Sequence, residues 1–261
     1  MRVLVVSNQK GGVGKTTTAI SLGAALVDRG ERVLIVDLDP QANATSGLGA
    51  EKTGAIHRVL LKSTPITESV VHTQLEGLHL IPSGPDMAGA EVELVPVMAR
   101  EFRLREALRA AEGAYDTVLI DCPPSLGLLT VNALAAGDGV VVPVQCEYYA
   151  LEGLAQLLET IEAVRQRLND KLEVLAIVLT MEDRRNRLSM QVIEEVRKHF
   201  PKLVARTRIP RTVRLAEAPS HGKPISVYDP TSPATKAYAD LAVEVEDRMN
   251  ARAPIALAGS A

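Results

Sequence analysis

Several residue types that often mark a function are scarce in this chain of 261 residues. Tryptophan is absent, phenylalanine and cysteine occur twice each, and aromatic residues make up 3% of the sequence. Cys122 and Cys146 are too few and too far apart for a disulfide framework, and no C-x-x-C pair suggests a metal or cluster site. We therefore expect both to be small buried apolar residues in a reduced, cytoplasmic protein.

Long apolar runs are also missing, so no segment approaches the roughly 20 residues that a membrane-spanning helix requires. Because the first strand is expected to begin at residue 2, no signal peptide is expected. Apolar residues nevertheless make up 46% of the chain, which is enough for a sizeable core of Val, Leu, Ile and Ala. The length suits one large domain, which we expect over residues 1–250, with a disordered tail at 251–261.

Strand-like and helix-like segments alternate along most of the chain, although residues 43–100 are less regular. This alternation predicts an α/β fold with a doubly wound, mostly parallel sheet and helices on both faces. The predicted strands are residues 3–6, 32–36, 78–81, 117–120, 140–144 and 174–179, with short apolar runs at 203–205 and 225–227. The first predicted helix follows the first strand and ends near residue 29. The other predicted helices cover residues 101–112, 126–136, 151–168, 188–200 and 233–249.

The most informative segment is residues 9–18, which read QKGGVGKTTT between the first predicted strand and a stretch with helical spacing. Strand, glycine-rich loop and helix form the context of a phosphate-binding loop, where backbone N–H groups and a helix N-terminus bind an anion. The generic pattern G-x-x-x-x-G-K-[ST] asks for glycine where this chain has Gln9, and a second lysine, Lys10, follows. The loop is therefore a variant. Its expected phosphate-binding residues are Gly11, Gly12, Val13, Gly14, Lys15, Thr16 and Thr17.

The loop pattern predicts ATP and Mg²⁺ as ligands. Lys15 should lie over the β- and γ-phosphates, the Thr16 hydroxyl should bind Mg²⁺, and Thr17 should reach the α-phosphate. The run TVLID at 117–121 is typical of a Walker B strand, whose terminal Asp121 also holds the metal.

Two further carboxylates, Asp37 and Asp39, stand at the end of the second predicted strand. Side chains alternate along a strand, so only one of the two can point at the phosphates. Composition and spacing do not decide which.

Taken together, these motifs resemble the deviant Walker A ATPases of the ParA/MinD family. The resemblance runs from residue 2 to about residue 248. It rests on the loop at 10–17, on DLDPQAN at 37–43 and on DCPPS at 121–125. Residues 143–153 and 209–224 resemble the chromosomal ParA (Soj) branch.

The resemblance implies roles for individual residues. Lys10 is the signature lysine, expected to reach across an ATP-sandwich homodimer to the partner subunit's phosphates, as an arginine finger does. Asp39 is expected to orient the attacking water, which favours for Asp37 a structural role or one that supports a neighbouring site residue. The implied catalytic residues are Lys10, Lys15 and Asp39, and the segment expected against the adenine contains Pro210 and Arg211.

Positive charge is concentrated in one part of the chain. The net charge is −3, yet residues 184–214 contain ten Lys or Arg side chains and two acids. A solvated face explains part of this excess, because cations favour helix C-termini. Non-specific binding of double-stranded DNA through its phosphates is the sharper hypothesis. The candidate contacts are Arg184, Arg185, Arg187, Arg206 and Arg214, with Arg185 favoured by the family resemblance.

Other proteins share this type of loop. The acidic last helix argues against a MinD-like membrane helix. The missing cysteine pairs argue against a nitrogenase-reductase or cluster scaffold, and the start on a core strand argues against a repressor with an extra N-terminal domain. We expect a chromosome- or plasmid-segregation ATPase on the nucleoid, with no membrane contact. The family resemblance implies a ParB-type centromere-binding protein that stimulates its hydrolysis. The alternative is a nucleotide switch that regulates replication initiation or cell division through protein contacts.

Overall fold

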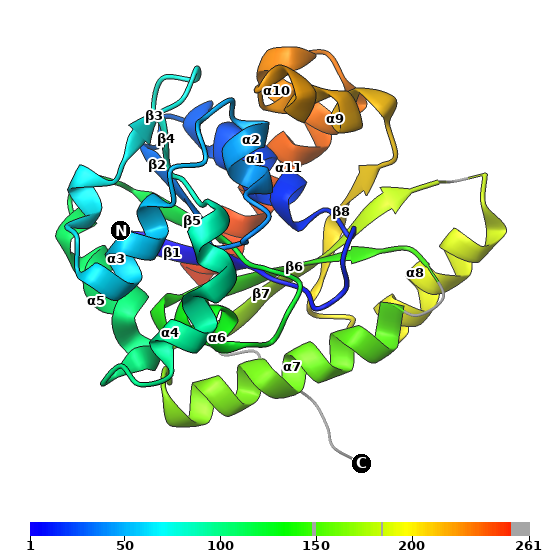
Figure 1. Ribbon diagram of the computed structural model, residues 1–261. Helices are drawn as coiled ribbons and strands as arrows, with labels where there is room; N and C mark the ends of the chain where they lie inside the picture. The colour runs from blue at the N-terminus through cyan, green and yellow to red at the C-terminus, as the bar shows by residue number, and fades with distance from the viewer. Residues whose placement is uncertain (148–149, 184, 252–261) are drawn as a thin grey trace.

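The computed structural model describes residues 1–147, 150–183 and 185–251. They form one eight-stranded sheet of order β3-β4-β2-β5-β1-β6-β7-β8 (Figure 1). Neighbouring strands run parallel except for the antiparallel pair β3 and β4, which confirms the predicted doubly wound, mostly parallel sheet. The strands are β1 (Arg2–Val6), β2 (Val33–Asp37), β3 (Val71–His72), β4 (Leu78–Ile81), β5 (Thr117–Asp121), β6 (Gly139–Gln145), β7 (Glu173–Glu182) and β8 (Val204–Pro210).

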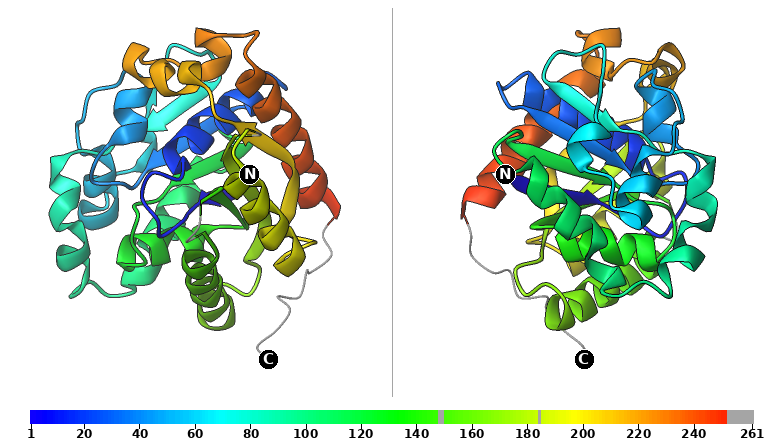
Figure 2. Two further views of the ribbon diagram at one scale, coloured as in Figure 1. Left: turned by 90° about the vertical axis from the view of Figure 1, so that its right-hand side faces the viewer. Right: turned by 60° about the vertical axis from the view of Figure 1, so that its left-hand side comes forward.

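Helices cover both faces of the sheet (Figure 2). Val3 and Val5 of β1 belong to the apolar cluster on one face, and Leu4 and Val6 belong to the cluster on the other. This double burial explains why the central strands read as continuous apolar runs. The helices are α1 (Lys15–Val27), α2 (Asn43–Gly47), α3 (Ala55–Lys62), α4 (Ala90–Leu94), α5 (Arg103–Leu108), α6 (Leu128–Ala136), α7 (Ala150–Arg167), α8 (Arg187–His199), α9 (Val213–Glu217), α10 (Ile225–Tyr228) and α11 (Pro233–Ala251).

Two predicted elements differ from the structure, and the short apolar run at 225–227 lies in the helix α10 rather than in a strand. The helix predicted over 101–112 is the shorter α5, flanked by 3₁₀ turns at Arg100–Phe102 and Arg109–Ala111. The apolar spacing of a 3₁₀ turn is too close to that of an α-helix for the sequence to separate them. The short run at 203–205 is the start of the longer β8, whose exposed edge position allows polar residues that hide the strand pattern.

The end of the chain follows the prediction up to the last helix, and α11 continues through Ala251. Ala251, the first residue of the tail predicted at 251–261, is thus helical, and residues 252–261 lie outside the described residues; the single-domain division at residue 250 stays a prediction. None of the helices in the described part of the chain is long and apolar enough to span a membrane.

α11 lies against β8, the outermost strand, and bonds to its backbone. The buried Glu244 carboxylate accepts hydrogen bonds from the N–H groups of Arg206 and Thr207, at 2.9 and 3.0 Å. Arg248, one turn further along α11, donates to the carbonyl oxygens of Leu175, Leu203 and Val204.

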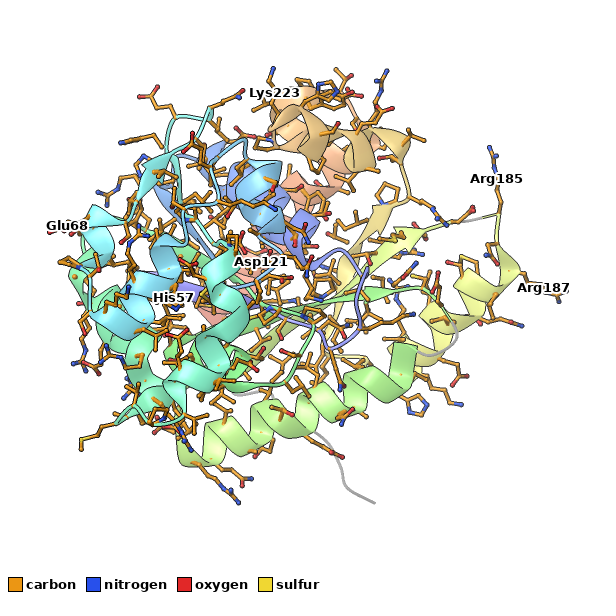
Figure 3. All side chains as sticks on the ribbon, viewed as in Figure 1. His57, Glu68, Asp121, Arg185, Arg187 and Lys223 are labelled. Atoms are coloured by element: carbon orange, nitrogen blue, oxygen red, sulfur yellow. The ribbon has the colours of Figure 1, made fainter. Side chains whose placement is uncertain are left out.

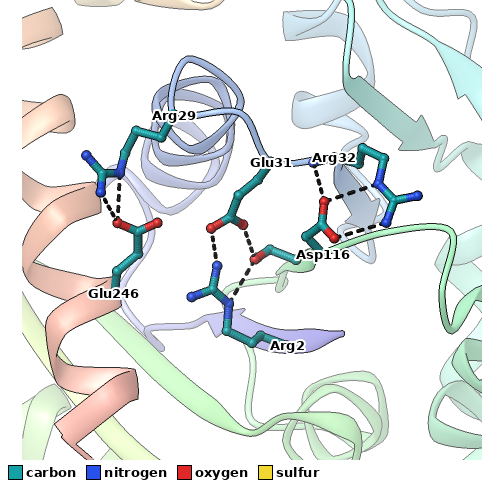
Figure 4. A network of polar contacts seen from close by, with 7 residues as sticks. Arg2, Arg29, Glu31, Arg32, Asp116 and Glu246 are labelled. Atoms are coloured by element: carbon teal, nitrogen blue, oxygen red, sulfur yellow. Dashed lines mark hydrogen bonds and ion pairs between the residues drawn. The ribbon is translucent and has the colours of Figure 1, made fainter.

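Ion pairs connect the elements at the N-terminal ends of the strands (Figure 4). Arg2 of β1 pairs with Glu31, which also accepts a hydrogen bond from Thr117 of β5. Arg32 donates to Asp116 through both its backbone and its guanidinium, at 2.9 to 3.1 Å. The turn between α1 and β2, which carries Glu31 and Arg32, is also joined to α11 by an ion pair between Arg29 and Glu246.

Candidate nucleotide-binding site

The predicted site residues meet at the C-terminal edge of the sheet. β5 lies between β1 and β2, so that Asp121 is the register partner of both Val6 and Asp37. This order confirms that the Walker B strand lies beside the first strand. The loop after β1, the carboxylates after β2 and the end of β5 therefore surround one point, where open α/β sheets bind ligands.

The glycine-rich loop runs from β1 to α1 through two left-handed backbone positions. Gly12 has φ +75° and Gly14 has φ +88°, values that strain any residue with a side chain. The loop is fastened at both ends. Asn8 donates to the Pro143 carbonyl of β6 at 2.7 Å, and Thr180 of β7 donates to the Val13 carbonyl at 2.8 Å. Sequence reasoning missed both anchors, because their partners lie more than one hundred residues away.

Lys15 is the first residue of α1 and is almost buried, with 7% of its surface exposed. Its ammonium donates to the backbone carbonyl of Lys10 at 3.1 Å. Burial lowers the pKa of Lys15, and the negative charge of Asp121 opposes that shift. An anion in the loop would favour the charged form of this lysine.

Asp121 is fully buried (Figure 3), and neither of its carboxylate oxygens has a hydrogen-bond partner among the described residues. Burial raises the pKa of Asp121 well above its usual range, and the charge of Asp37 adds to the rise. The Thr16 hydroxyl lies close enough to oppose that rise. An unpaired buried carboxylate next to a hydroxyl is costly in isolation but provides the oxygen ligands that Mg²⁺ prefers. These residues fit the metal that the sequence predicts.

The two carboxylates after β2 differ in their surroundings. Asp37 is fully buried and accepts hydrogen bonds from Asp39 N at 3.2 Å and from the backbone and hydroxyl of Thr45 at 2.8 and 2.7 Å. Burial raises the pKa of Asp37 to about 6, and the bonds from Thr45 oppose the rise. Asp39 is 6% exposed and accepts from Gln41 N at 2.9 Å. Protein donors thus occupy both oxygens of Asp37, in agreement with a structural role.

Lys10 forms an ion pair within its own chain. Its ammonium lies 3.2 Å from Glu147 Oε2, and both side chains are partly exposed. Gln145, at the end of β6, donates to the other oxygen of Glu147 at 2.7 Å. Glu147 is 137 positions from Lys10, so no local pattern could have predicted this pair.

Pro210 and Arg211, the predicted adenine segment, lie at the C-terminal end of β8. Arg211 N donates to the carbonyl of Glu182 in β7 at 3.1 Å, and Pro210 is the register partner of Glu182. The segment therefore lies on the same edge of the sheet as the loop, one strand beyond the Thr180 anchor.

The predicted DNA contacts lie on several elements. Arg185 and Arg187 point away from the body of the protein at the start of α8, whose first turn is capped by Asn186 (Figure 3). Arg206 lies on β8 with 81% of its side chain exposed. Arg214 lies on α9, where Glu217 is 3.2 Å from its guanidinium and reduces its local charge. Arg184 lies outside the described residues.

A parallel sheet whose first strand leads through a glycine-rich loop into a helix, beside a buried acid on the next strand, defines a P-loop ATPase. A family model described as an AAA domain matches residues 1–174. The sporulation initiation inhibitor protein Soj of Bacillus subtilis is 55% identical over 247 residues, covering 94% of this chain and 98% of that protein. The chromosome-partitioning ATPase Soj of Thermus thermophilus is 55% identical over 249 residues, covering 95% and 97%.

A solved structure from Mycobacterium smegmatis, described as cobyrinic acid a,c-diamide synthase with bound ATP analogue and magnesium, has a TM-score of 0.85. It is 39% identical and covers 98% of both chains. The chain belongs to the ParA/MinD family, in its chromosomal Soj branch. It is an ATP hydrolase, and the solved relative described above holds an ATP analogue and magnesium.

Proposed function

We propose that this ATPase segregates chromosomes or plasmids by cycling between a monomer and an ATP-bound dimer that coats double-stranded DNA. The observation that carries the proposal is the path of β7. Its residue Thr180 bonds the nucleotide loop at Val13, and the outward-pointing Arg185 follows five positions later. Between them, Met181 holds a left-handed backbone with φ +54°. The Thr180 anchor of the nucleotide loop thus lies only a few residues along the chain from the start of the basic surface, by which we mean Arg185, Arg187, Arg206 and Arg214.

In the proposed site each group has one task. Lys15 lies over the β- and γ-phosphates, Thr17 reaches the α-phosphate, and Asp39 orients the attacking water. Bound Mg²⁺ supplies positive charge against the phosphate oxygens. Thr16 and Asp121 would hold it, the loop backbone from Gly11 to Gly14 would surround the phosphates, and Pro210 and Arg211 would lie against the adenine.

Lys10 serves the partner subunit in this mechanism. To reach the partner's phosphates, Lys10 must leave Glu147. The cost is small, because an exposed ion pair of this kind contributes only about 0–1 kcal/mol to stability. Phosphates in a closed interface attract the ammonium more strongly, because water is excluded there. ATP therefore holds the dimer together, and hydrolysis releases it.

DNA binding in the dimer is non-specific and bivalent. Arg185 and Arg187 contact phosphates rather than bases, and pairing two such surfaces raises the affinity well above that of a monomer. Arg206 and Arg214 extend the surface. A ParB-type centromere-binding protein would stimulate hydrolysis, and the protein would be cytoplasmic and associated with the nucleoid. Membrane attachment through α11 is disfavoured, because its apolar residues Tyr238 and Leu241 are buried.

The test is binding of random-sequence duplex DNA with ATP or ADP over a range of salt concentrations. We expect tighter binding with ATP, a steep loss of affinity as salt rises, and at least a tenfold loss in Arg185→Glu. The matched control is Arg167→Glu, the same charge reversal at the far end of α7. Binding that is absent, or unchanged in Arg185→Glu, would favour the alternative, a nucleotide switch that acts through protein contacts.

A further inference from the structure

We propose that Thr45 and Ser83 are positioning residues that hold Asp39 in place for hydrolysis. The inference rests on the role proposed above for Asp39 as the residue that orients the attacking water. It concerns two hydroxyl groups, one on α2 and one after β4, that lie outside every motif of the sequence analysis.

A closed set of hydrogen bonds joins these residues. The Thr45 hydroxyl donates to Asp37 at 2.7 Å and accepts from Ser83 N at 2.9 Å. Asp37 accepts from Asp39 N at 3.2 Å, and the Ser83 hydroxyl donates to the Asp39 carbonyl at 2.8 Å. Both backbone polar groups of Asp39 are therefore bonded inside the protein, which leaves its carboxylate directed by a fixed main chain.

All members of the set are buried. Asp37, Thr45 and Ser83 have 0% of their surface exposed, and Asp39 has 6%. Hydrogen bonds in such surroundings are strong, and a partner left without its bond is costly. The position of Asp39 is thus defined by several bonds that water cannot easily replace.

The backbone on either side of Ser83 is itself held in place by hydrogen bonds. The chain from Pro82 to Gly84 lies against the start of α3, with Gly54 N donating to Ser83 O and Ile56 N to Pro82 O, each at 3.2 Å. A side chain at Gly84 would come within 2.6 Å of Gly54 N. This contact is too close for any other residue, so the approach that delivers the Ser83 hydroxyl depends on glycine at 84.

The backbone turn that leads into α2, the helix of Thr45, is also constrained. Ala42, directly before α2, has a left-handed backbone with φ +54°, which is rare for a residue with a Cβ atom. Its N–H donates to the Asp39 carbonyl at 2.8 Å, the same oxygen that accepts from Ser83. The strained turn and the Ser83 hydroxyl therefore meet on the Asp39 main chain.

The experiment compares Thr45→Val and Ser83→Ala with two matched controls in the full chain. Thr117→Val and Ser69→Ala each remove a buried hydroxyl away from the site. Single-turnover hydrolysis of MgATP and the affinity for ATP are measured on every variant. We expect turnover to fall at least tenfold in Thr45→Val and Ser83→Ala with ATP affinity within twofold, because misplacing a reacting group costs rate rather than binding. Thr45→Ser, which keeps the hydroxyl, should restore turnover to within threefold.

A second arm separates positioning from general damage. In an Asp39→Ala background, Thr45→Val and Ser83→Ala should cause no further loss, because they act through the residue already removed. Additive losses, or equal losses in the two controls, would overturn the inference alone. Unchanged turnover in Asp39→Ala itself would overturn the proposed role of Asp39, and the inference with it.

Discussion

Among single residues, the two lysines of the loop differ most in their surroundings. Lys15 is buried and bonded to the loop backbone, whereas Lys10 is partly exposed and paired with Glu147. A buried lysine at the start of a helix suits a phosphate of its own chain, and an exposed one suits a phosphate brought from outside. The difference leads to a test of the extra lysine.

Lys10→Ala should leave the fold intact and abolish ATP-driven pairing. The lost ion pair with Glu147 is exposed, so we expect a change of about 1 kcal/mol or less in the free energy of unfolding. Size-exclusion chromatography with a non-hydrolysable ATP analogue checks the pairing, with Lys62→Ala on α3 as the control. A Lys10→Ala variant that still dimerises with nucleotide would contradict the role in the partner site.

Between elements, the largely apolar contact of α1 with α11 contains one buried pair of hydroxyl groups. The Thr18 hydroxyl and the Tyr238 hydroxyl lie 3.2 Å apart, and both residues are almost fully buried. Burial raises the pKa of Tyr238 well above its usual range, so the hydroxyl stays protonated. The pair thus joins the helix that follows the nucleotide loop to the last helix of the chain.

Tyr238→Phe should lower the free energy of unfolding by about 1 kcal/mol or somewhat more, because it leaves the Thr18 hydroxyl buried without a partner. Adding Thr18→Val removes that unpaired group and should recover part of the loss. Urea unfolding of the two single variants and the double variant measures the difference. Strictly additive losses would show that the two hydroxyls do not depend on each other.

The turn between α1 and β2 predicts a response to acid. The hydrogen bonds and charge of Arg32 lower the pKa of Asp116 from 3.8 to about 2. The native state therefore binds fewer protons than the unfolded state between these values, so this contribution to stability is complete above about pH 4 and is lost as the pH falls through about 2. Asp116→Asn should lose less stability than the parent between pH 5 and pH 2.5 in urea unfolding. Arg32→Gln should show the same weaker dependence, and an unchanged dependence in both would refute the assignment.

How far the elements could be predicted depends on whether their signals are local. The loop at 9–18 and the Walker B run are contiguous, and their strand and helix context is readable from the residues themselves. β8 was missed beyond its first residues, because Arg206 and Arg208 occupy an exposed edge strand where polar side chains are allowed. In the site, Thr45, Ser83 and Glu147 were missed, since each acts through a partner that only the tertiary fold brings close.

For the whole molecule, the proposed cycle ties oligomeric state to DNA affinity. Asp39→Ala should bind ATP but hydrolyse it much more slowly, and should therefore accumulate as a dimer. Two basic surfaces then contact DNA together, so the slope of log affinity against log salt should be steeper for this dimer than for the ADP-bound monomer. Size-exclusion chromatography and DNA titrations with ATP test this. A monomer under all conditions would rule out the sandwich dimer, and a dimer that forms without nucleotide would rule out the switch.

The bonds from α11 to β8 have a consequence for how the last strand is held. The register between β7 and β8 shifts twice, so their backbone pairing is irregular. Glu244 accepts from two N–H groups of β8 in this region, and Arg248 donates to the Leu175 carbonyl of β7 and to the Leu203 carbonyl next to β8. The last helix therefore supplies partners that the irregular strand pairing leaves open, and helps to hold the final strand in the sheet.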